Sequence, residues 1–242
     1  MKKANIMGVE FNNISLTDAV EFAISQIKKG EKGYVVTPNP EIVYKAMYDT
    51  EFCTLINNAS LVLPDGIGVI YASKILGKGL KTRVTGIDFA SLLMQRMSEE
   101  NMRLFLLGAK PSVAEKAAEN LKQKYSGLVI AGTKDGYFKD DKEAVEAINS
   151  VGGADVVFVC LGAPKQEKFM SNNKESLNAY LCCGLGGCLD VFAGTVQRAP
   201  DIFIKLGMEW FYRLCKEPKR IGRMMKLPLF MLLVIRKKLF GR

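Results

Sequence analysis

The stretch VVFVCLGAPKQE, residues 156–167, joins an unbroken apolar run to a turn of small residues and then to a segment with a helical pattern. An apolar run without polar alternation is typical of a strand that is buried on both faces of a parallel sheet. Glycine and proline directly after the run end the strand. We therefore predict a strand at 156–161, a turn, and a helix at 165–173.

The same unit recurs along the chain. Further apolar runs predict strands at 34–37, 61–63, 104–107, 128–131 and 180–183. Helical patterns lie between them at 17–29, 41–57, 88–100, 112–125 and 141–150. Regular alternation of strands and helices is typical of an α/β protein, so we predict a Rossmann-like, doubly wound, mostly parallel sheet.

The chain has 242 residues, of which 48% are hydrophobic, which is enough for one substantial core and a small addition. Its character changes around residues 194–200, and Pro218 and Pro228 then predict a series of short helices, since a helix tends to end before a proline. We predict a catalytic core over residues 1–195 and a small helical C-terminal appendage over residues 196–242.

The positive charge lies in this appendage. Residues 1–195 hold 22 Lys and Arg against 22 Asp and Glu, whereas residues 196–242 hold 12 against 3, which accounts for the net charge of +9. A cationic end favours a polyanionic partner, either nucleic acid or anionic lipid. The apolar stretch 229–235, followed by Arg236, Lys237 and Lys238, favours lipid.

Two interpretations of the appendage stay open at this point. Its basic residues Arg213, Lys216, Arg220 and Arg223 recur at helical spacing, either as an interfacial surface or as the charged face of helices packed on the core. The apolar run 227–235 is too short to cross a bilayer, which needs about 20 residues, and the N-terminus lacks an apolar signal segment. We expect a cytoplasmic protein bound peripherally to the inner face of the cell membrane.

Several predicted strands end in turn residues, and in a parallel sheet such loops form the ligand crevice. Gly108 and Gly162 each stand between a strand and a helix, where backbone N–H groups favour phosphate, although ordinary turns have the same sequence. Asp65, in LPDGIG at 63–68, is either a catalytic carboxylate or a helix-capping turn residue.

The composition limits the chemistry. There is no histidine, no Asp-x-Asp pair and no CxxC spacing among the six cysteines. These features favour a reaction without metal or cofactor, with a base other than histidine. A departing diphosphate would then need cationic side chains such as Arg83 and the arginines of the appendage.

The order of the motifs is more specific than any one of them. TPNPE (37–41), LPDGIG (63–68), RVTG (83–86), LGA (107–109), LGAPKQE (161–167) and FAG (192–194) are followed by RAP (198–200), LGMEWFYRL (206–214) and EPKR (217–220). This series resembles the WecG/TagA/CpsF family of glycosyltransferases over nearly the entire chain, and its TagA branch most closely.

The resemblance implies an activity and its partners. It implies inverting transfer of N-acetylmannosamine from UDP-N-acetylmannosamine to polyprenyl-diphosphate-linked N-acetylglucosamine, with a β-1,4 linkage, as the committed step of wall teichoic acid synthesis. An anionic membrane surface is then an expected partner, and nucleic acid is not. The acceptor chain length and the formation of homo-oligomers are left open.

The resemblance also implies residue roles. Asp65 is expected to be the catalytic base, and Thr37, Asn39, Arg83 and Gln166 are expected to line the pocket. From their positions, we expect Gly108, Gly162 and Gly187 to admit the diphosphate or ribose, Tyr137 to stack on uracil, and Arg213, Arg220 and Arg223 to contact a diphosphate.

Three alternatives remain at this stage. The chain could use another UDP-sugar, it could be a nicotinamide-dependent oxidoreductase, or it could bind nucleic acid through its basic tail. The oxidoreductase is disfavoured because the first strand is followed by TPNP (37–40) and not by GxGxxG.

Overall fold

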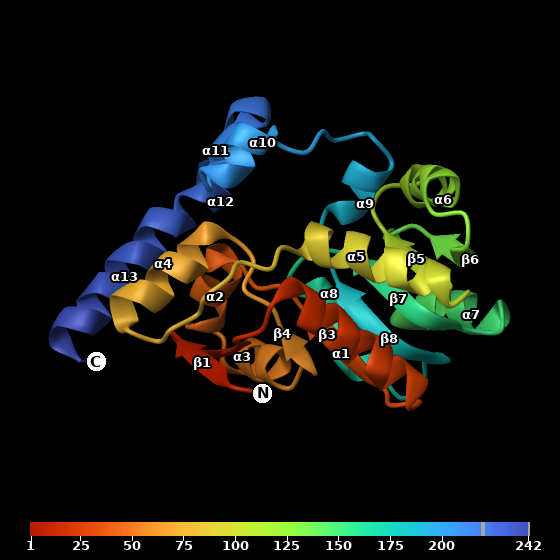
Figure 1. The fold of residues 1–242 in the computed structure, drawn as a ribbon, viewed down its shortest axis with the longest axis horizontal. Coiled ribbons are helices and arrows are strands. Elements are labelled where there is room, and N and C mark those ends of the chain that lie inside the picture. Colours follow the sequence, from red (N-terminus) through yellow and green to blue (C-terminus); the bar gives the residue numbers. More distant parts are fainter. Residues whose placement is uncertain (219–220, 242) are drawn as a thin grey trace.

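The centre of the molecule is a six-stranded sheet in which every pairing of strands is parallel (Figure 1). The computed structural model describes residues 1–218 and 221–241, apart from the side chains of Lys205, Arg213 and Arg223. The strand order is β4-β3-β8-β7-β5-β6. The strands are β3 (Gly33–Val36), β4 (Leu61–Val62), β5 (Arg103–Gly108), β6 (Val129–Lys134), β7 (Ala154–Cys160) and β8 (Ala179–Gly184). All six predicted strands and the parallel sheet are confirmed.

The predicted helices are confirmed with one correction. Five of them correspond to α1 (Leu16–Lys28), α5 (Gly86–Glu99), α6 (Val113–Lys124), α7 (Asp141–Ser150) and α8 (Lys165–Asn173). The predicted single helix at 41–57 is wrong: it is divided into α2 (Pro40–Ala46) and α3 (Thr50–Asn57). The carboxylate of Asp49 accepts a hydrogen bond from the Phe52 N–H at 2.9 Å and begins a new helix there.

The N-terminal hairpin, the helix at residues 67–76 and α9 (Cys188–Phe192) were not among the predictions. The chain begins with an antiparallel hairpin, β1 (Lys3–Ile6) and β2 (Val9–Asn12), and residues Ile67–Leu76 form α4. Asn12 joins the hairpin to the sheet, because its side-chain oxygen accepts a hydrogen bond from the Val62 N–H at 2.8 Å. The hairpin thereby extends the core beside β4.

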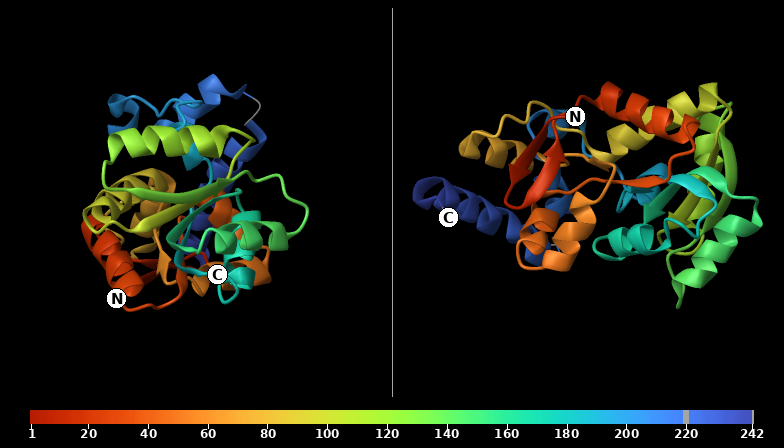
Figure 2. Two further views of the ribbon diagram at one scale, coloured as in Figure 1. Left: turned by 90° about the vertical axis from the view of Figure 1, so that its right-hand side faces the viewer. Right: turned by 90° about the horizontal axis from the view of Figure 1, so that it is seen from below.

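The sheet carries a hydrophobic layer on each face, because alternate side chains of its strands point to opposite sides. Val35 and Leu181 face the layer that contains α1, α5, α6 and α9 (Cys188–Phe192). Val36 and Cys182 face the layer that contains the hairpin and helices α2, α3, α4, α7 and α8. Figure 2 shows the two layers from the side.

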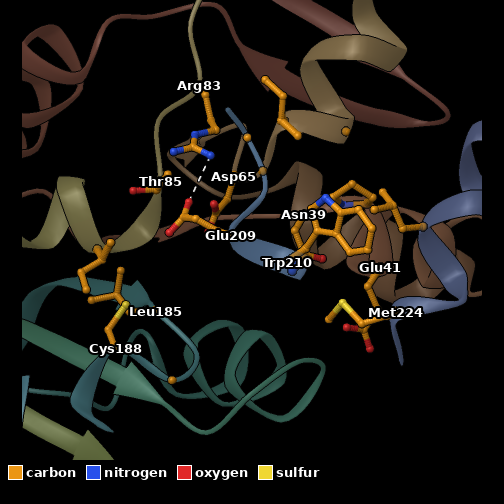
Figure 3. Close-up of a pocket in the computed structure, with 18 of the residues that line it drawn as sticks. Asn39, Glu41, Asp65, Arg83, Thr85, Leu185, Cys188, Glu209, Trp210 and Met224 are labelled. Atoms are coloured by element: carbon orange, nitrogen blue, oxygen red, sulfur yellow. Dashed lines mark ion pairs between the residues drawn. The ribbon is translucent and has the colours of Figure 1, made fainter. Parts of the chain in front are cut away.

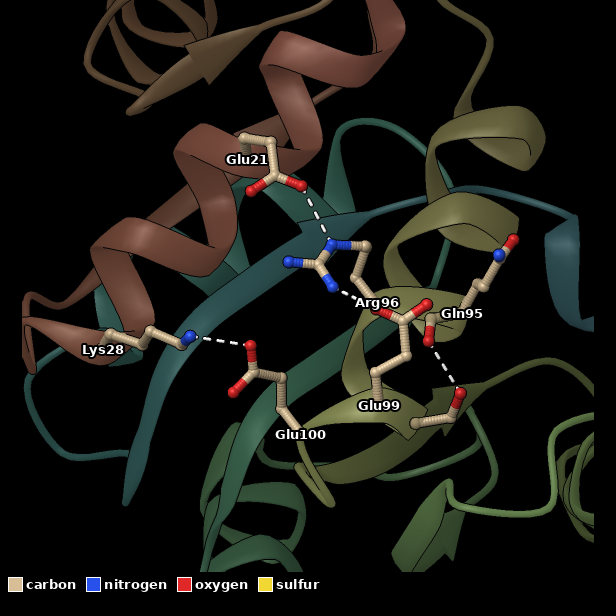
Figure 4. A network of polar contacts seen from close by, with 7 residues as sticks. Glu21, Lys28, Gln95, Arg96, Glu99 and Glu100 are labelled. Carbon is tan, nitrogen blue, oxygen red and sulfur yellow. Dashed lines mark hydrogen bonds and ion pairs between the residues drawn. The ribbon is translucent and has the colours of Figure 1, made fainter.

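Polar contacts add to the packing of α1 on α5 (Figure 4). Arg96 pairs with Glu21 and Glu99, and the Lys28 ammonium lies 2.7 Å from Glu100, where its hydrogen bond lowers the pKa of that carboxyl. Exposed pairs of this kind contribute little to stability. The contact between the two helices depends mainly on their buried apolar side chains.

The described part of the C-terminal segment contains α10 (Asp201–Lys205), α11 (Glu209–Lys216), α12 (Ile221–Met224) and α13 (Lys226–Phe240). Pro218 lies between α11 and α12, as predicted. Helix α12 ends before Pro228, as predicted, and Pro228 then lies in the first turn of α13, where a missing N–H needs no partner.

Helix α13 lies along α4 and α2 (Figure 1), and its Phe230 and Val234 are fully buried in the same layer as those helices. Within the described ranges, no helix is both long enough and apolar enough to span a bilayer.

The close approach of β5 to β7 gives a stability prediction. Gly108 has a φ of +125°, and a Cβ there would lie 2.3 Å from the carbonyl oxygen of Cys160. Gly162 has a φ of +74° with open space around it. We expect Gly162→Ala to lower the free energy of unfolding by about 1–2 kcal/mol from backbone strain alone, and Gly108→Ala to lower it further because the methyl group also collides with the backbone. Denaturant unfolding measures the free energy of unfolding of both variants. Equal decreases in the two variants would contradict a close approach of Gly108 to the Cys160 backbone.

A candidate active site at the carboxyl ends of the strands

A crevice lies beyond the carboxyl ends of β3 and β8. The two strands are neighbours, with Val36 opposite Gly184, and the chain leaves them toward opposite faces. After β3 it enters α2 on one layer, and after β8 it enters α9 on the other. Diverging loops of this kind leave a ligand crevice outside the strand ends.

The crevice contains two adjoining cavities. The first, which we call the glycine-lined cavity, has a volume of about 790 Å³. The second, the Arg83 cavity, has a volume of about 190 Å³ (Figure 3). The residues that line both are Asn39, Glu41, Asp65, Leu185, Gly187 and Val191. A group bound in one cavity therefore lies next to a group bound in the other.

Asp65 lies at this junction. The backbone N–H of Asp65 donates to the Pro38 carbonyl at 3.2 Å, which fixes the loop after β4 against the loop after β3. Its carboxylate Oδ2 accepts from the Gly86 N–H at 3.4 Å, at the N-terminus of α5. The positive end of the helix dipole favours a negative charge at that position. Asp65 is half-buried, so a ligand in either cavity can reach it.

Thr37 and Asn39 hold the loop after β3 in place. The Thr37 hydroxyl donates to the Gly184 carbonyl at 3.0 Å, which ties this loop to the end of β8. The Asn39 side-chain oxygen accepts from the Ile42 N–H at 3.0 Å and caps α2. The Asn39 side-chain amide N–H groups are not used by that cap. The structure thus brings both predicted residues together beside Asp65.

Gln166 fixes the loop after β8. Its side-chain oxygen accepts from the Gly186 N–H at 3.0 Å, and its amide donates to Glu167 Oε1 at 2.9 Å. Glu167 is only 1% exposed, and its second oxygen, Oε2, has no hydrogen-bond partner among the described residues. Burial raises the pKa of this carboxyl, while the hydrogen bond from Gln166 opposes the shift.

The remaining predicted site residues of the core line the glycine-lined cavity, except Gly108. Gly162 and Gly187 line it, and Tyr137, which is 70% exposed, stands on its rim. Gly108 does not line it; its neighbour Ala109 does, while Gly108 packs on the backbone of Cys160. The Lys165 ammonium supports the rim, since it donates to the Gly136 carbonyl at 3.1 Å and lies over the Phe138 ring.

Arg83 faces the smaller cavity and pairs with a residue of the C-terminal segment. Its guanidinium Nη1 lies 3.1 Å from Glu209 Oε2, and both side chains are 16% exposed (Figure 3). Trp210, Met224 and Leu227 line the same cavity. Helices α11, α12 and α13 therefore supply one wall of a site whose other walls belong to the sheet.

The predicted arginines of the C-terminal segment are placed only in part. Arg213 lies on α11 and Arg223 on α12, but their side chains are outside the described part of the structure. Arg220 lies outside the described residues altogether. Their predicted contacts with a diphosphate stay a prediction.

Some lining residues were missed by the sequence analysis. Three are lysines of the glycine-lined cavity: Lys45, Lys110 and Lys226. Lys110 could have been found, because it directly follows the turn at Gly108 and Ala109. Lys226 could not, because α13 brings it from far along the chain to lie 3.6 Å from Glu41. The cavity is also lined by the carboxylates of Glu41, Asp65, Asp190 and Glu217, so these three ammonium groups are its described candidates for contact with a diphosphate.

Among the described residues, no group of three or more acidic or cysteine side chains is placed to hold a metal ion. Burial raises the pKa of Cys160 and of Cys182 to about 12, so both are unreactive thiols. The metal-independent mechanism stays a prediction.

Comparison with known proteins gives a consistent result. The chain matches the glycosyl transferase WecG/TagA/CpsF family over residues 4–242. It is 36% identical to the N-acetylglucosaminyldiphosphoundecaprenol N-acetyl-beta-D-mannosaminyltransferase of Bacillus spizizenii, over 98% of this chain and 92% of that protein. Proteins of the same name from Bacillus subtilis and Staphylococcus aureus are 34% and 36% identical, each over 98% of this chain and 93% of the relative.

The buried Glu167 gives a prediction on pH. Its pKa in the folded protein is raised above the ordinary value of 4.5, so above that pH the unfolded chain loses this proton more readily than the folded one. The wild type should therefore lose stability relative to Glu167→Gln as the pH rises from about 4.5 toward neutrality. Urea unfolding of both proteins across this pH range measures the difference between their free energies of unfolding. A difference that does not change with pH would show that the pKa of Glu167 is not raised.

Proposed function

Because the chain belongs to the WecG/TagA/CpsF family of glycosyl transferases, we propose that it transfers N-acetylmannosamine from UDP-N-acetylmannosamine to N-acetylglucosamine carried on a polyprenyl diphosphate. The sugar and the lipid-linked acceptor are those in the names of its relatives, which match it over nearly their full length. The reaction is the committed step of wall teichoic acid synthesis. The family assignment replaces the oxidoreductase and nucleic-acid-binding interpretations.

One observation carries the mechanism: Asp65 lies where the two cavities meet. With the donor in the glycine-lined cavity and the acceptor sugar in the Arg83 cavity, the acceptor hydroxyl and the anomeric carbon meet beside this carboxylate. Asp65 takes the proton from the hydroxyl, the oxygen attacks the anomeric carbon, and the bond to UDP breaks. A single displacement inverts the configuration at that carbon.

The larger cavity supplies what the departing UDP requires. Lys45, Lys110 and Lys226 line it and balance the charge that develops on the diphosphate. Gly162 and Gly187 leave room for the phosphates or ribose to approach the backbone. Tyr137 is exposed at the rim, where its ring can stack on uracil. Thr37, Asn39 and Gln166 hold the surrounding loops in shape.

The experiment that tests this function is release of UDP from UDP-N-acetylmannosamine in the presence of EDTA, with and without the lipid-diphosphate acceptor. Release that depends on the acceptor supports the proposed metal-independent transfer. A parallel arm with UDP-N-acetylglucosamine tests the donor sugar. Equal or faster transfer from that donor would overturn the proposed donor.

Asp65→Asn gives a prediction on turnover. The amide cannot take the proton, so kcat should fall by about 10²–10⁴-fold, while UDP affinity and thermal stability stay close to wild type. Asp190→Asn is the matched control, because Asp190 lines only the glycine-lined cavity, and it should lose much less activity. Steady-state kinetics measure both, and undiminished turnover in Asp65→Asn would remove Asp65 from the role of base.

We further propose that residues 196–242 form an appendage that docks on the inner face of an anionic membrane, where the lipid acceptor lies. Exposed apolar side chains on α13, which include Leu229, Leu232, Ile235 and Leu239, adjoin the basic residues Arg236–Lys238. Each basic residue near an anionic surface contributes about 1 kcal/mol. Phe230 and Val234 are buried in the core and hold the opposite face of α13.

The prediction for membrane docking uses exposed residues, because deletion of α13 would remove part of the core. Leu232→Glu with Leu239→Glu should reduce co-sedimentation with phosphatidylglycerol vesicles at least about tenfold, since two apolar contacts are lost and two negative charges gained. Val129→Glu, which replaces an exposed residue of β6, is the matched control and should bind as wild type does. Unchanged binding of the double variant would contradict this docking surface.

A further inference from the structure

The Arg83 cavity has an aromatic wall that comes from the C-terminal segment. Trp210, on α11, lines the cavity and is 38% exposed (Figure 3). Its ring meets the Phe211 ring edge-on, with centroids 5.8 Å apart. A partly exposed tryptophan at a cavity wall leaves a flat apolar face available to a ligand. Ile67 and Leu227 line the same cavity and add to its apolar surface.

The cavity also has a polar edge. It is formed by the ion pair of Arg83 with Glu209, together with Asp65 and Asn39. The guanidinium offers several N–H donors in a fixed plane, and the carboxylate and amide oxygens accept hydrogen bonds. An apolar platform beside a dense polar edge matches a pyranose ring, whose faces carry C–H groups and whose rim carries hydroxyl groups.

Charge and size separate this cavity from the one assigned to the nucleotide. At about 190 Å³ it is much smaller than the glycine-lined cavity of about 790 Å³. The positive charge of Arg83 is already balanced by Glu209, and Asp65 adds a negative charge. Among the described residues that line the Arg83 cavity, three carboxylates, Glu41, Asp65 and Glu209, stand against the one guanidinium of Arg83, and these carboxylates can accept hydrogen bonds from the hydroxyls of a neutral sugar.

We propose that Trp210 and the Glu209–Arg83 pair form the subsite for the acceptor sugar. In this subsite, Trp210 packs against one face of the pyranose ring. Glu209 accepts hydrogen bonds from the hydroxyl groups of the sugar and orients the Arg83 guanidinium toward the sugar. The inference rests on the proposed function, because it takes the acceptor to be a lipid-linked hexosamine. Recognition of the acceptor then requires α11 to be docked beside Asp65, whereas the glycine-lined cavity takes the donor.

The chain provides its own probe, since Trp210 is its single tryptophan. We would titrate the full-length protein with farnesyl-diphosphate-linked N-acetylglucosamine, and separately with UDP, and follow tryptophan emission. The acceptor should change the emission with a saturating curve, and UDP alone should leave it nearly unchanged. If the acceptor is turned over while the emission stays constant at saturation, the subsite is wrong and the proposed function stands. If the acceptor is neither turned over nor detected by Trp210, both fail.

Kinetics of variants show whether Trp210 and Glu209 contact the acceptor directly or only hold α11 against the core. Trp210→Ala and Glu209→Gln should each raise the acceptor KM at least about tenfold, which corresponds to about 1.4 kcal/mol, with the donor KM unchanged. Trp210→Phe keeps an aromatic face and should recover most of the acceptor affinity.

Arg198→Gln is the matched control for Glu209→Gln. It breaks the ion pair of Arg198 with Asp88, at 2.7 Å, which also joins the C-terminal segment to the core, but Arg198 lines neither cavity. Its acceptor KM should stay near wild type. An equal rise in Arg198→Gln and Glu209→Gln would overturn a direct role for Glu209 and leave only docking.

Discussion

The hydrogen-bonded pairing of β3 with β8 is the constraint from which the site follows. These strands lie side by side as the second and third strands of the sheet, and the chain leaves them toward opposite faces. A crevice must then form beyond their ends, whatever side chains line it. The hydroxyl of Thr37 bonds across this gap to the Gly184 carbonyl and fixes its width at the base. Thr37 and Asn39 lie on the loop after β3, and Gly187 lies on the loop after β8, so this pairing positions them directly.

The polar residues of the crevice depend on one another. Gln166 holds the Gly186 N–H, and the buried Glu167 holds the amide of Gln166 in one orientation. Asp65 is placed by a backbone contact to the Pro38 carbonyl and faces the start of α5. Loops fixed in this way need little reorganisation when charge develops during the reaction, which is the condition for electrostatic stabilisation of a transition state.

The C-terminal helices give the site its other half. Two buried side chains, Phe230 and Val234, attach α13 to the core, and ion pairs at Glu209 and Lys226 lie at the edges of the cavities. The same helices present apolar and basic side chains to the outside. One segment thus closes the acceptor side of the site and carries the surface proposed for the membrane, so the two roles are coupled by its position.

The sequence by itself determined the parallel sheet, because strands buried on both faces leave unbroken apolar runs that can be recognised locally. It also determined the positions of Thr37 and Asp65 on the loops after β3 and β4, and of Gln166 in the first turn of α8, since each lies shortly after a strand end. Local patterns did not separate α2 from α3, because the apolar pattern continues across the cap at Asp49 where the second helix begins. Only the tertiary structure placed Glu209, Trp210 and Lys226 beside Asp65. Those contacts join residues more than a hundred positions apart. A local periodicity of the sequence cannot predict which distant surfaces pack together.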